Sequence, residues 1–240
     1  MRDDLTVVIL PGLDGTGVLS RDLLAMLATH SDAIVVDYPT DKFLNYDQLL
    51  AYVRSLLPQG KFVLVGESFS GPLALRLAAE APPGLEGVVL GASFARLDLP
   101  LKKLLSFVTA MVSPRAVPIS VLSFFLLGRF ATAGSVQALG GMLAKVKSEV
   151  LTERARAALA VDLPFSGIKV DCPVLYLQAQ HDRLIPRSAA TVVAEICSNI
   201  RVETIDGPHF LFHAAPQASA ASIRGFCNGL SLRKVRDFRD

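Results

Sequence analysis

The sequence predicts an α/β fold, a doubly wound and mostly parallel sheet with helices on both faces and one inserted helical cap. Short apolar runs rich in valine, isoleucine and leucine recur along the 240 residues. Each run is continuous rather than alternating, which is typical of strands buried on both faces of a parallel sheet. Stretches with helical spacing lie between the runs, and this alternation of strand and helix indicates a doubly wound sheet.

Six strands and the helices between them follow from these patterns. The expected strands are Thr6–Leu10, Ala33–Val36, Phe62–Val65, Val88–Leu90, Val174–Leu177 and Val202–Ile205. The helical stretches between them include Leu19–Ala28, Leu49–Leu57, Pro72–Ala81 and Ala189–Ile196. In such sheets the chemistry takes place in the crevice at the carboxyl ends of the strands. We therefore expect the functional side chains in the loops that follow the strands.

The alternation is interrupted between residues 95 and 161. No strand run occurs there, and helical patterns are separated by prolines and glycines. A segment of this length is too long for a loop, so we interpret it as a helical cap. The core then comprises residues 1–94 and 162–230, and a basic C-terminal tail follows at residues 231–240.

Composition and charge exclude two classes of protein. Hydrophobic residues make up 51% of the chain and charged residues 19%, which excludes a disordered chain and predicts a sizeable core. The chain has 24 basic and 22 acidic residues, and the excess lies in Arg233–Asp240, with four basic and two acidic residues. Because the rest is balanced, we do not expect a nucleic-acid partner.

The cysteines and the apolar segments indicate in which cellular compartment we expect the protein. Cys172, Cys197 and Cys227 are far apart and odd in number, so we expect free thiols, no zinc site and a reducing, cytoplasmic location. Met1–Asp4 is acidic where a signal peptide needs positive charge. The most membrane-like run, Val117–Leu127, has eleven residues, against roughly 20 needed to span a bilayer. We therefore expect no transmembrane segment.

The most informative segment runs from an expected strand directly into an expected helix, with Ser68 at the turn. A sharp turn of this kind brings together the residues two places before and after the serine, so both must be small. Gly66 meets this requirement on one side. On the other side Ser70 stands where glycine is usual, and Gly71 follows it. Ser68 is therefore a candidate nucleophile, and the alternative is an ordinary helix N-cap serine.

With this turn, the chain resembles the α/β-hydrolase superfamily, of the serine esterase or lipase-like type with a helical cap. The resemblance covers about residues 5–94 and 170–227. It implies a nucleophile, an acid and a histidine in this chain order. The implied base is His209, after the last expected strand, with His213 as the alternative. The implied acid is Asp182, which follows Val174–Leu177 a few residues before a proline-led helix.

The resemblance also implies two backbone donors for the oxyanion of a tetrahedral intermediate. One is the N–H of Phe69, and the other is the N–H of Leu13, in the glycine-rich loop after the first strand. The alternative interpretation of that loop is a phosphate-binding site. The dinucleotide spacing is absent, however, no Walker lysine follows, and Asp14 would repel phosphate. Similar loops occur in relatives that transfer acyl chains to alcohols.

These residues predict a serine hydrolase that cleaves carboxylic esters, or thioesters, through an acyl-enzyme on Ser68, with no metal or organic cofactor. One alternative is an acyltransferase or thioesterase that uses the same three residues. Another is a cofactor-free perhydrolase, and a third is a non-catalytic, ligand-binding homologue. A serine at the turn argues against the epoxide-hydrolase and haloalkane-dehalogenase branches, in which this residue would be aspartate.

The expected cap bears on the substrate. Phe124 and Phe125 are candidate substrate-binding residues, and the alternative is that they pack the cap against the core. Residues 95–161 contain nine basic and three acidic residues, a net charge of +6. This charge is suited to an acidic acyl carrier, an anionic acyl thioester or a membrane surface, and the alternative is a solvated face. The expected substrate is a small-molecule ester or acyl thioester.

Overall fold

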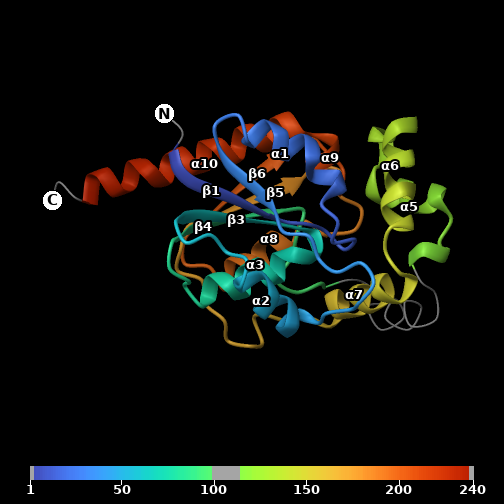
Figure 1. Ribbon diagram of the computed structural model, residues 1–240, viewed down its shortest axis with the longest axis horizontal. Helices are drawn as coiled ribbons and strands as arrows, with labels where there is room; N and C mark the ends of the chain where they lie inside the picture. Colours follow the sequence, from blue (N-terminus) through green and yellow to red (C-terminus); the bar gives the residue numbers. More distant parts are fainter. Residues whose placement is uncertain (1–2, 99–113, 238–240) are drawn as a thin grey trace.

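The computed structural model describes residues 3–98 and 114–237 (Figure 1). All six expected strands are present, and they pair in parallel in one sheet with the order β2-β1-β3-β4-β5-β6. The strands are β1 Asp3–Leu10, β2 Ser31–Val35, β3 Lys61–Glu67, β4 Leu85–Gly91, β5 Val174–Ala179 and β6 Ile200–Ile205. The predicted doubly wound α/β fold is therefore confirmed.

Helices pack on both faces of this sheet. They are α1 Arg21–Leu27, α2 Tyr46–Arg54, α3 Gly71–Ala79, α8 Ala189–Ala194, α9 Leu211–Ala214 and α10 Pro216–Asp237. The second helix begins at Tyr46, earlier than the expected Leu49, because a capping box extends its first turn. Asn45 accepts the backbone N–H of Gln48 at 2.9 Å, and the Gln48 side chain accepts the N–H of Asn45 at 3.0 Å.

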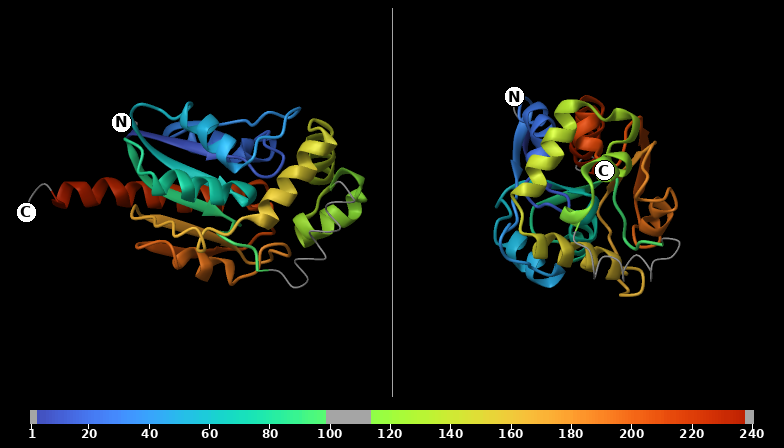
Figure 2. Two further views of the ribbon diagram at one scale, coloured as in Figure 1. Left: turned by 90° about the horizontal axis from the view of Figure 1, so that it is seen from below. Right: turned by 90° about the vertical axis from the view of Figure 1, so that its right-hand side faces the viewer.

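Two apolar layers hold these helices on the sheet (Figures 1 and 2). Successive side chains of a strand point to opposite faces. In β1, Val7 and Ile9 pack in the layer that contains α1, α9 and α10. Val8 and Leu10 pack in the layer that contains α2, α3 and α8. All of the strand carboxyl ends point to the same edge, where the loops after β1, β3, β5 and β6 meet.

The segment between β4 and β5 adds no strand to the sheet within the residues that are described. It contains α5 Ile119–Leu126, α6 Ala133–Ala144 and α7 Ser148–Ala160, which we call the inserted helices. They lie beyond the carboxyl ends of the strands (Figures 1 and 2). Leu139 and Met142 of α6 pack on Leu19, in the short turn that precedes α1. Residues 99–113 of the expected cap lie outside the described residues.

The expected basic tail at residues 231–240 is helical as far as Asp237, because α10 continues without a break from Pro216. Residues 238–240 lie outside the described part of the chain. The helix extends past the amino-terminal ends of the strands, away from the inserted helices (Figure 1). None of the helices in the two described ranges is long and apolar enough to cross a membrane.

Candidate active site

Ser68 stands at the tight turn between β3 and α3, with a positive φ of 47°. This conformation is rare for a residue with a side chain, and it exposes the hydroxyl at the edge of the sheet. A Cβ atom at Gly66 would lie 2.9 Å from the carbonyl oxygen of Ser70. The close approach that the sequence predicted at this turn is therefore present, and Gly66 makes it possible.

Ser70 replaces the usual glycine without crowding Gly66, because its side chain points to the loop after β1. Its hydroxyl donates a hydrogen bond to the carbonyl oxygen of Pro11, and the hydroxyl of Tyr38 lies 2.7 Å from its Oγ. The next residue, Gly71, packs so closely that an added Cβ would lie 1.8 Å from Oγ of Ser93. Ser70 therefore connects the turn to the neighbouring loop.

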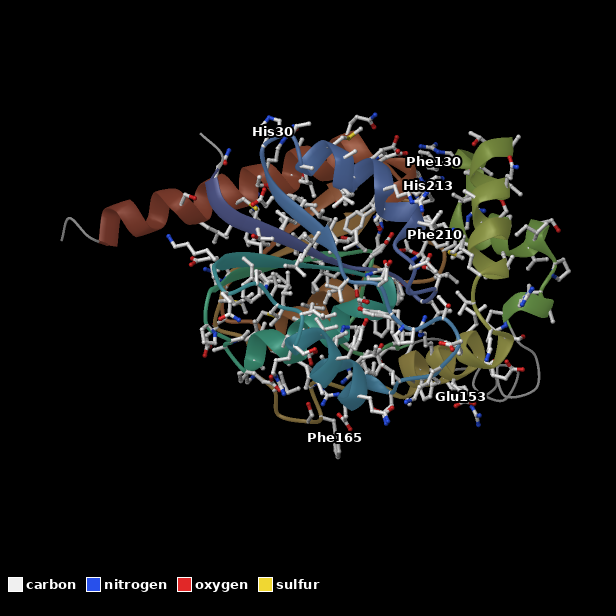
Figure 3. All side chains as sticks on the ribbon, viewed as in Figure 1. His30, Phe130, Glu153, Phe165, Phe210 and His213 are labelled. Atoms are coloured by element: carbon white, nitrogen blue, oxygen red, sulfur yellow. The ribbon has the colours of Figure 1, made fainter. Side chains whose placement is uncertain are left out.

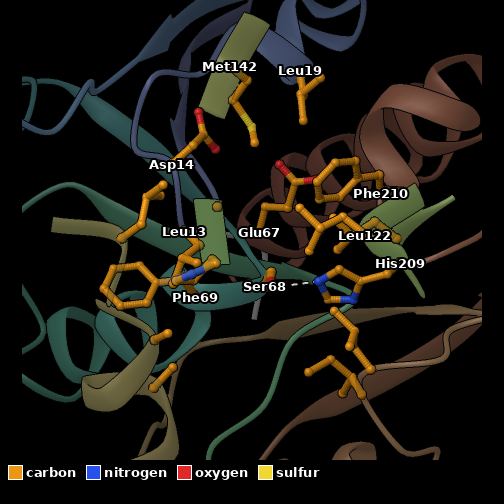
Figure 4. Close-up of a pocket in the computed structure, with 18 of the residues that line it drawn as sticks. Leu13, Asp14, Leu19, Glu67, Ser68, Phe69, Leu122, Met142, His209 and Phe210 are labelled. Atoms are coloured by element: carbon orange, nitrogen blue, oxygen red, sulfur yellow. Dashed lines mark hydrogen bonds between the residues drawn. The ribbon is translucent and has the colours of Figure 1, made fainter. Parts of the chain in front are cut away.

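The structure brings Ser68, His209 and Asp182 together at the carboxyl edge of the sheet. Oγ of Ser68 lies 2.9 Å from Nε2 of His209, and these two side chains point toward one another (Figure 4). Nδ1 of His209 lies 2.9 Å from Oδ2 and 3.2 Å from Oδ1 of Asp182. The backbone N–H groups of Leu184 and Ile185 donate to Oδ1 of Asp182 at 2.8 and 2.9 Å, which orients this carboxylate.

Electrostatics favour a proton on His209. Burial alone would lower the pKa of this imidazole. The charge of Asp182 and its hydrogen bond act in the opposite direction, as does the carboxyl group of Glu67, and together they raise the pKa above its ordinary value of 6.5. A base placed in this way accepts a proton readily from the serine hydroxyl and keeps it while charge develops.

The alternative base, His213, and the two remaining histidines lie elsewhere. His213 is on α9 and does not line the cavity beside Ser68, and His30 lies near the end of α1 (Figure 3). Nε2 of His181 lies 2.9 Å from Oδ1 of Asp206 and 3.0 Å from Nη2 of Arg129, which donates to Asp206 at 2.9 Å. The contacts therefore place His209 beside Ser68 and Asp182 beside the opposite nitrogen of its ring.

A cavity of about 270 Å³ opens beside Ser68 and His209. Most of its wall is aliphatic or aromatic, and the inserted helices supply a large part of it. The apolar residues of the wall include Leu13, Leu19, Phe69, Phe94, Leu97, Leu122, Leu126, Met142, Leu143, Leu151, Leu159, Leu184, Ile185 and Phe210. No lysine or arginine is among the described residues that line it. The cavity therefore suits an uncharged, apolar group.

Phe124 and Phe125, the expected substrate-binding residues, do not line this cavity. Their exposed fractions are 55% and 41%, and neither lines its wall. Leu122 and Leu126, four residues apart on one side of α5, line it instead. The ring of Phe124 packs on the guanidinium of Arg183, 4.1 Å from its centroid, so this helix side faces outward.

Two buried carboxyl groups in the cavity wall were not predicted as site residues. Glu67 precedes Ser68, and Asp14 follows Leu13, and both line the cavity (Figure 4). Burial and the charge of Asp14 raise the pKa of Glu67 to about 7, against the opposing effects of His209 and of a 3.2 Å hydrogen bond from Ser20. The only sequence signals were their positions beside Ser68 and in the glycine-rich loop.

Leu13 and Phe69 both line the cavity next to Ser68. Among the described residues, neither backbone N–H donates a hydrogen bond to another group of the protein. The loop that carries Leu13 turns tightly, with the N–H of Gly15 bonded to the carbonyl of Gly12 at 3.1 Å. Both residues therefore lie beside the same cavity as Ser68, and their role as oxyanion donors stays a prediction.

No group of three or more metal-ligating side chains occurs within the described ranges. Several expected basic residues of the inserted segment have partners. Arg129 pairs with Asp206 at 2.9 Å, Arg156 pairs with Glu153 at 2.9 Å, and Arg154 is completely buried. Glu153 is already subtracted in the net charge of +6, but Asp206 lies outside the segment and Arg154 is buried, so these two cations do not add free positive charge to its surface.

Comparisons with known proteins identify the family. A model of the alpha/beta hydrolase family matches residues 7–222. The chain belongs to this family. No curated protein matches the sequence significantly.

Solved structures of low sequence identity share the fold. A hydrolase from Pseudomonas aeruginosa PA01 is 17% identical with a TM-score of 0.78, over 95% of this chain and 91% of that chain. A thermophilic esterase from Thermogutta terrifontis is 19% identical with a TM-score of 0.78, over 96% and 92%. An esterase from Exiguobacterium antarcticum is 17% identical with a TM-score of 0.79, over 94% and 92%. At these identities the likeness concerns the fold alone.

Proposed function

We propose that this alpha/beta hydrolase cleaves carboxylic esters of uncharged, apolar acyl groups through an acyl-enzyme on Ser68. The observation that carries the proposal is the 2.9 Å approach of Ser68 Oγ to His209 Nε2, with Asp182 on the opposite ring nitrogen, at the wall of an apolar cavity. A serine hydroxyl is a weak nucleophile, and a base oriented by a third group is what activates it.

In the first half of the reaction, Oγ of Ser68 forms a bond to the ester carbonyl carbon while its proton moves to Nε2 of His209. Asp182 stabilises the imidazolium, and the N–H groups of Leu13 and Phe69 donate to the oxyanion. The bond to the leaving oxygen then breaks, and His209 gives that oxygen its proton. The alcohol departs, and the acyl group stays on Ser68.

In the second half, water takes the place of the alcohol. His209 accepts a proton from this water as its oxygen attacks the acyl carbon, and the same two backbone groups receive the oxyanion. The bond between Ser68 and the acyl group breaks, Ser68 recovers its proton from His209, and the carboxylic acid is released. We propose further that the inserted helices act as a cap, because they supply much of the wall that would enclose the acyl chain.

The cavity also suggests the acyl length. An apolar cavity of about 150 Å³ holds one benzene molecule, so about 270 Å³ corresponds to an acyl chain of roughly ten carbon atoms. Asp14 and Glu67 line the cavity and no lysine or arginine does among the described residues, which disfavours an acyl group that carries its own carboxylate. We do not propose an acidic acyl carrier, because Arg96, Arg129 and Arg156 are paired with carboxylates and Arg154 is buried.

The proposal is tested with a fluorophosphonate probe and a series of p-nitrophenyl esters. We expect Ser68→Ala to abolish labelling and to lower ester turnover at least about a thousandfold. Ser55→Ala, which removes an exposed hydroxyl far from the site, is the matched control. Turnover that persists in Ser68→Ala would refute the proposal. Product analysis with an added alcohol distinguishes hydrolysis from acyl transfer, which needs the same three residues.

A further inference from the structure

Arg154 of α7 is the largest fully buried side chain among the described residues, and it lies under the loop that carries Leu13. Its Nη1 donates to the carbonyl oxygens of Leu13 at 3.0 Å and Asp14 at 2.7 Å, and its Nη2 donates to the carbonyl of Pro39 at 2.9 Å. A buried charge is costly unless it is hydrogen-bonded. Here three main-chain carbonyls accept hydrogen bonds from Nη1 and Nη2, while the buried Nε has no partner among the described residues. None of the described carboxylates forms an ion pair with Arg154.

The loop is shaped around this guanidinium. Gly15, next to Asp14, has a φ of +72°, and a Cβ atom there would lie 2.6 Å from Nη1 of Arg154 and 2.8 Å from Cβ of Tyr38. The Tyr38 ring packs against the guanidinium with its centroid 5.5 Å away. Only a glycine allows the main chain to come this close while it turns. Arg154 therefore binds the loop through specific hydrogen bonds and close packing, and it does not merely fill space.

A second contact holds the beginning of the same loop. The hydroxyl of Ser70 donates to the carbonyl of Pro11, and Tyr38 contacts both this hydroxyl and the guanidinium of Arg154. The peptide that carries the N–H of Leu13 thus lies between two fixed points. Pro11 is tied to the turn that carries Ser68, and the Leu13 and Asp14 carbonyls are tied to an inserted helix.

We propose that Arg154 and Ser70 are positioning residues that hold residues 11–14 so that the N–H of Leu13 faces the oxyanion formed at Ser68. This inference rests on the proposed function, and it makes the inserted segment part of the oxyanion-binding structure as well as part of the cavity wall. Backbone donors stabilise an oxyanion only when they are already aimed at the place where its charge develops.

The main test compares Arg154→Met and Arg154→Lys with Arg156→Met. Arg156 lies on the same helix, half exposed and paired with Glu153, so its replacement controls for a lost cation on α7. Active sites are first counted by fluorophosphonate titration, so that unfolded protein does not affect the rate constants. Then kcat and KM are measured with a p-nitrophenyl ester, and Ki is measured with an alkyl trifluoromethyl ketone, which forms an oxyanion on the serine.

We expect Arg154→Met to lower kcat per active site by about 10- to 100-fold, because a donor displaced by about an ångström loses that much. The Ki of the trifluoromethyl ketone should rise by a similar factor, and KM should change less than about threefold. Arg154→Lys should recover part of the loss, since an ammonium still reaches some of the carbonyls. The acidic limb of the pH–rate profile should not move, because His209 and Asp182 are untouched.

Ser70→Ala supplies an independent arm if Arg154→Met does not fold. It removes the contact with Pro11 and should lower kcat and weaken the trifluoromethyl ketone in the same proportion. Unchanged kcat and Ki in Arg154→Lys and Ser70→Ala, within about twofold of wild type, would overturn the inference while the proposed function stands. A wild-type protein that neither reacts with the probe nor turns over esters would overturn the proposed function first, and this inference with it.

Discussion

Replacing Glu67 by glutamine should make the protein less sensitive to rising pH. The Glu67 side chain is 5% exposed, and its neighbours in the cavity wall are mainly apolar. Burial raises its pKa from the ordinary 4.5 to about 7, and the charge of Asp14 adds to this effect. A glutamine has nearly the same shape and carries no charge at any pH. The glutamine side chain can still accept the hydrogen bond from Ser20, but it has no proton to lose as pH rises.

The sign and size follow from the two pKa values. The folded protein binds the Glu67 proton more tightly than the unfolded chain does. The protonated Glu67 therefore stabilises the folded state fully below pH 4.5, and this stabilisation is lost as pH rises through about 7. The difference between about 7 and 4.5, at 1.36 kcal/mol per pH unit, is about 3 kcal/mol. Between pH 5 and 8, wild type should therefore lose up to about 3 kcal/mol of stability relative to Glu67→Gln.

Urea denaturation at pH 5, 6, 7 and 8, followed by circular dichroism, measures this difference. The pKa of His209 is also raised, so its contribution to stability has the same sign. The comparison is therefore repeated in a His209→Gln background. Glu80→Gln, an exposed carboxylate paired with Arg54, is the matched control and should change stability by less than about 1 kcal/mol at every pH.

Parallel stability curves for wild type and Glu67→Gln across this pH range would refute the reasoning. They would mean that the carboxyl group is as well solvated in the folded protein as in the unfolded chain. In that case the cavity beside Ser68 would hold enough water to ionise Glu67, and the argument for an uncharged, apolar acyl group would lose much of its basis.

Three further results are expected. As pH falls, kcat/KM for esters should decrease with an apparent pKa above 6.5, because the raised pKa of His209 keeps the imidazole protonated and unable to accept the serine proton. An apparent pKa below 6 for this decrease would contradict the expectation. Leu122→Phe should shorten the preferred acyl chain by about two carbons in a p-nitrophenyl ester series, because it fills cavity volume, and an unmoved optimum would place the chain elsewhere. Gly71→Ala should cost about 1–3 kcal/mol in urea denaturation, because its Cβ would lie 1.8 Å from Oγ of Ser93, whereas Gly140→Ala, with open space around it, should not destabilise.

The sheet could be predicted because each strand is determined by a short segment of the sequence. Each buried strand is a continuous apolar run, and the structure extends these runs by a few residues at their ends. The start of α2 could not be seen in the same way. Its first turn is polar, and what begins it is the reciprocal capping between Asn45 and Gln48.

The candidate site was predictable in part for a similar reason. Parallel strands bring their carboxyl ends to one edge, so the loops that carry Ser68, Asp182 and His209 had to come close. Arg154 was not predictable, because its partners are main-chain carbonyls that every residue carries. The direction of Phe124 and Phe125 depends on how α5 is set against the sheet, and this is decided by contacts distant in sequence.

The carbonyl contacts of Arg154 bear on how this enzyme can be engineered. Chimeras that exchange the segment between β4 and β5 for that of another hydrolase are an attractive route to new specificity. Here such a graft would also remove a cation from beneath Leu13 and Asp14. A donor segment should therefore carry an arginine that reaches the same depth, and Gly15 of the recipient should be kept to receive it.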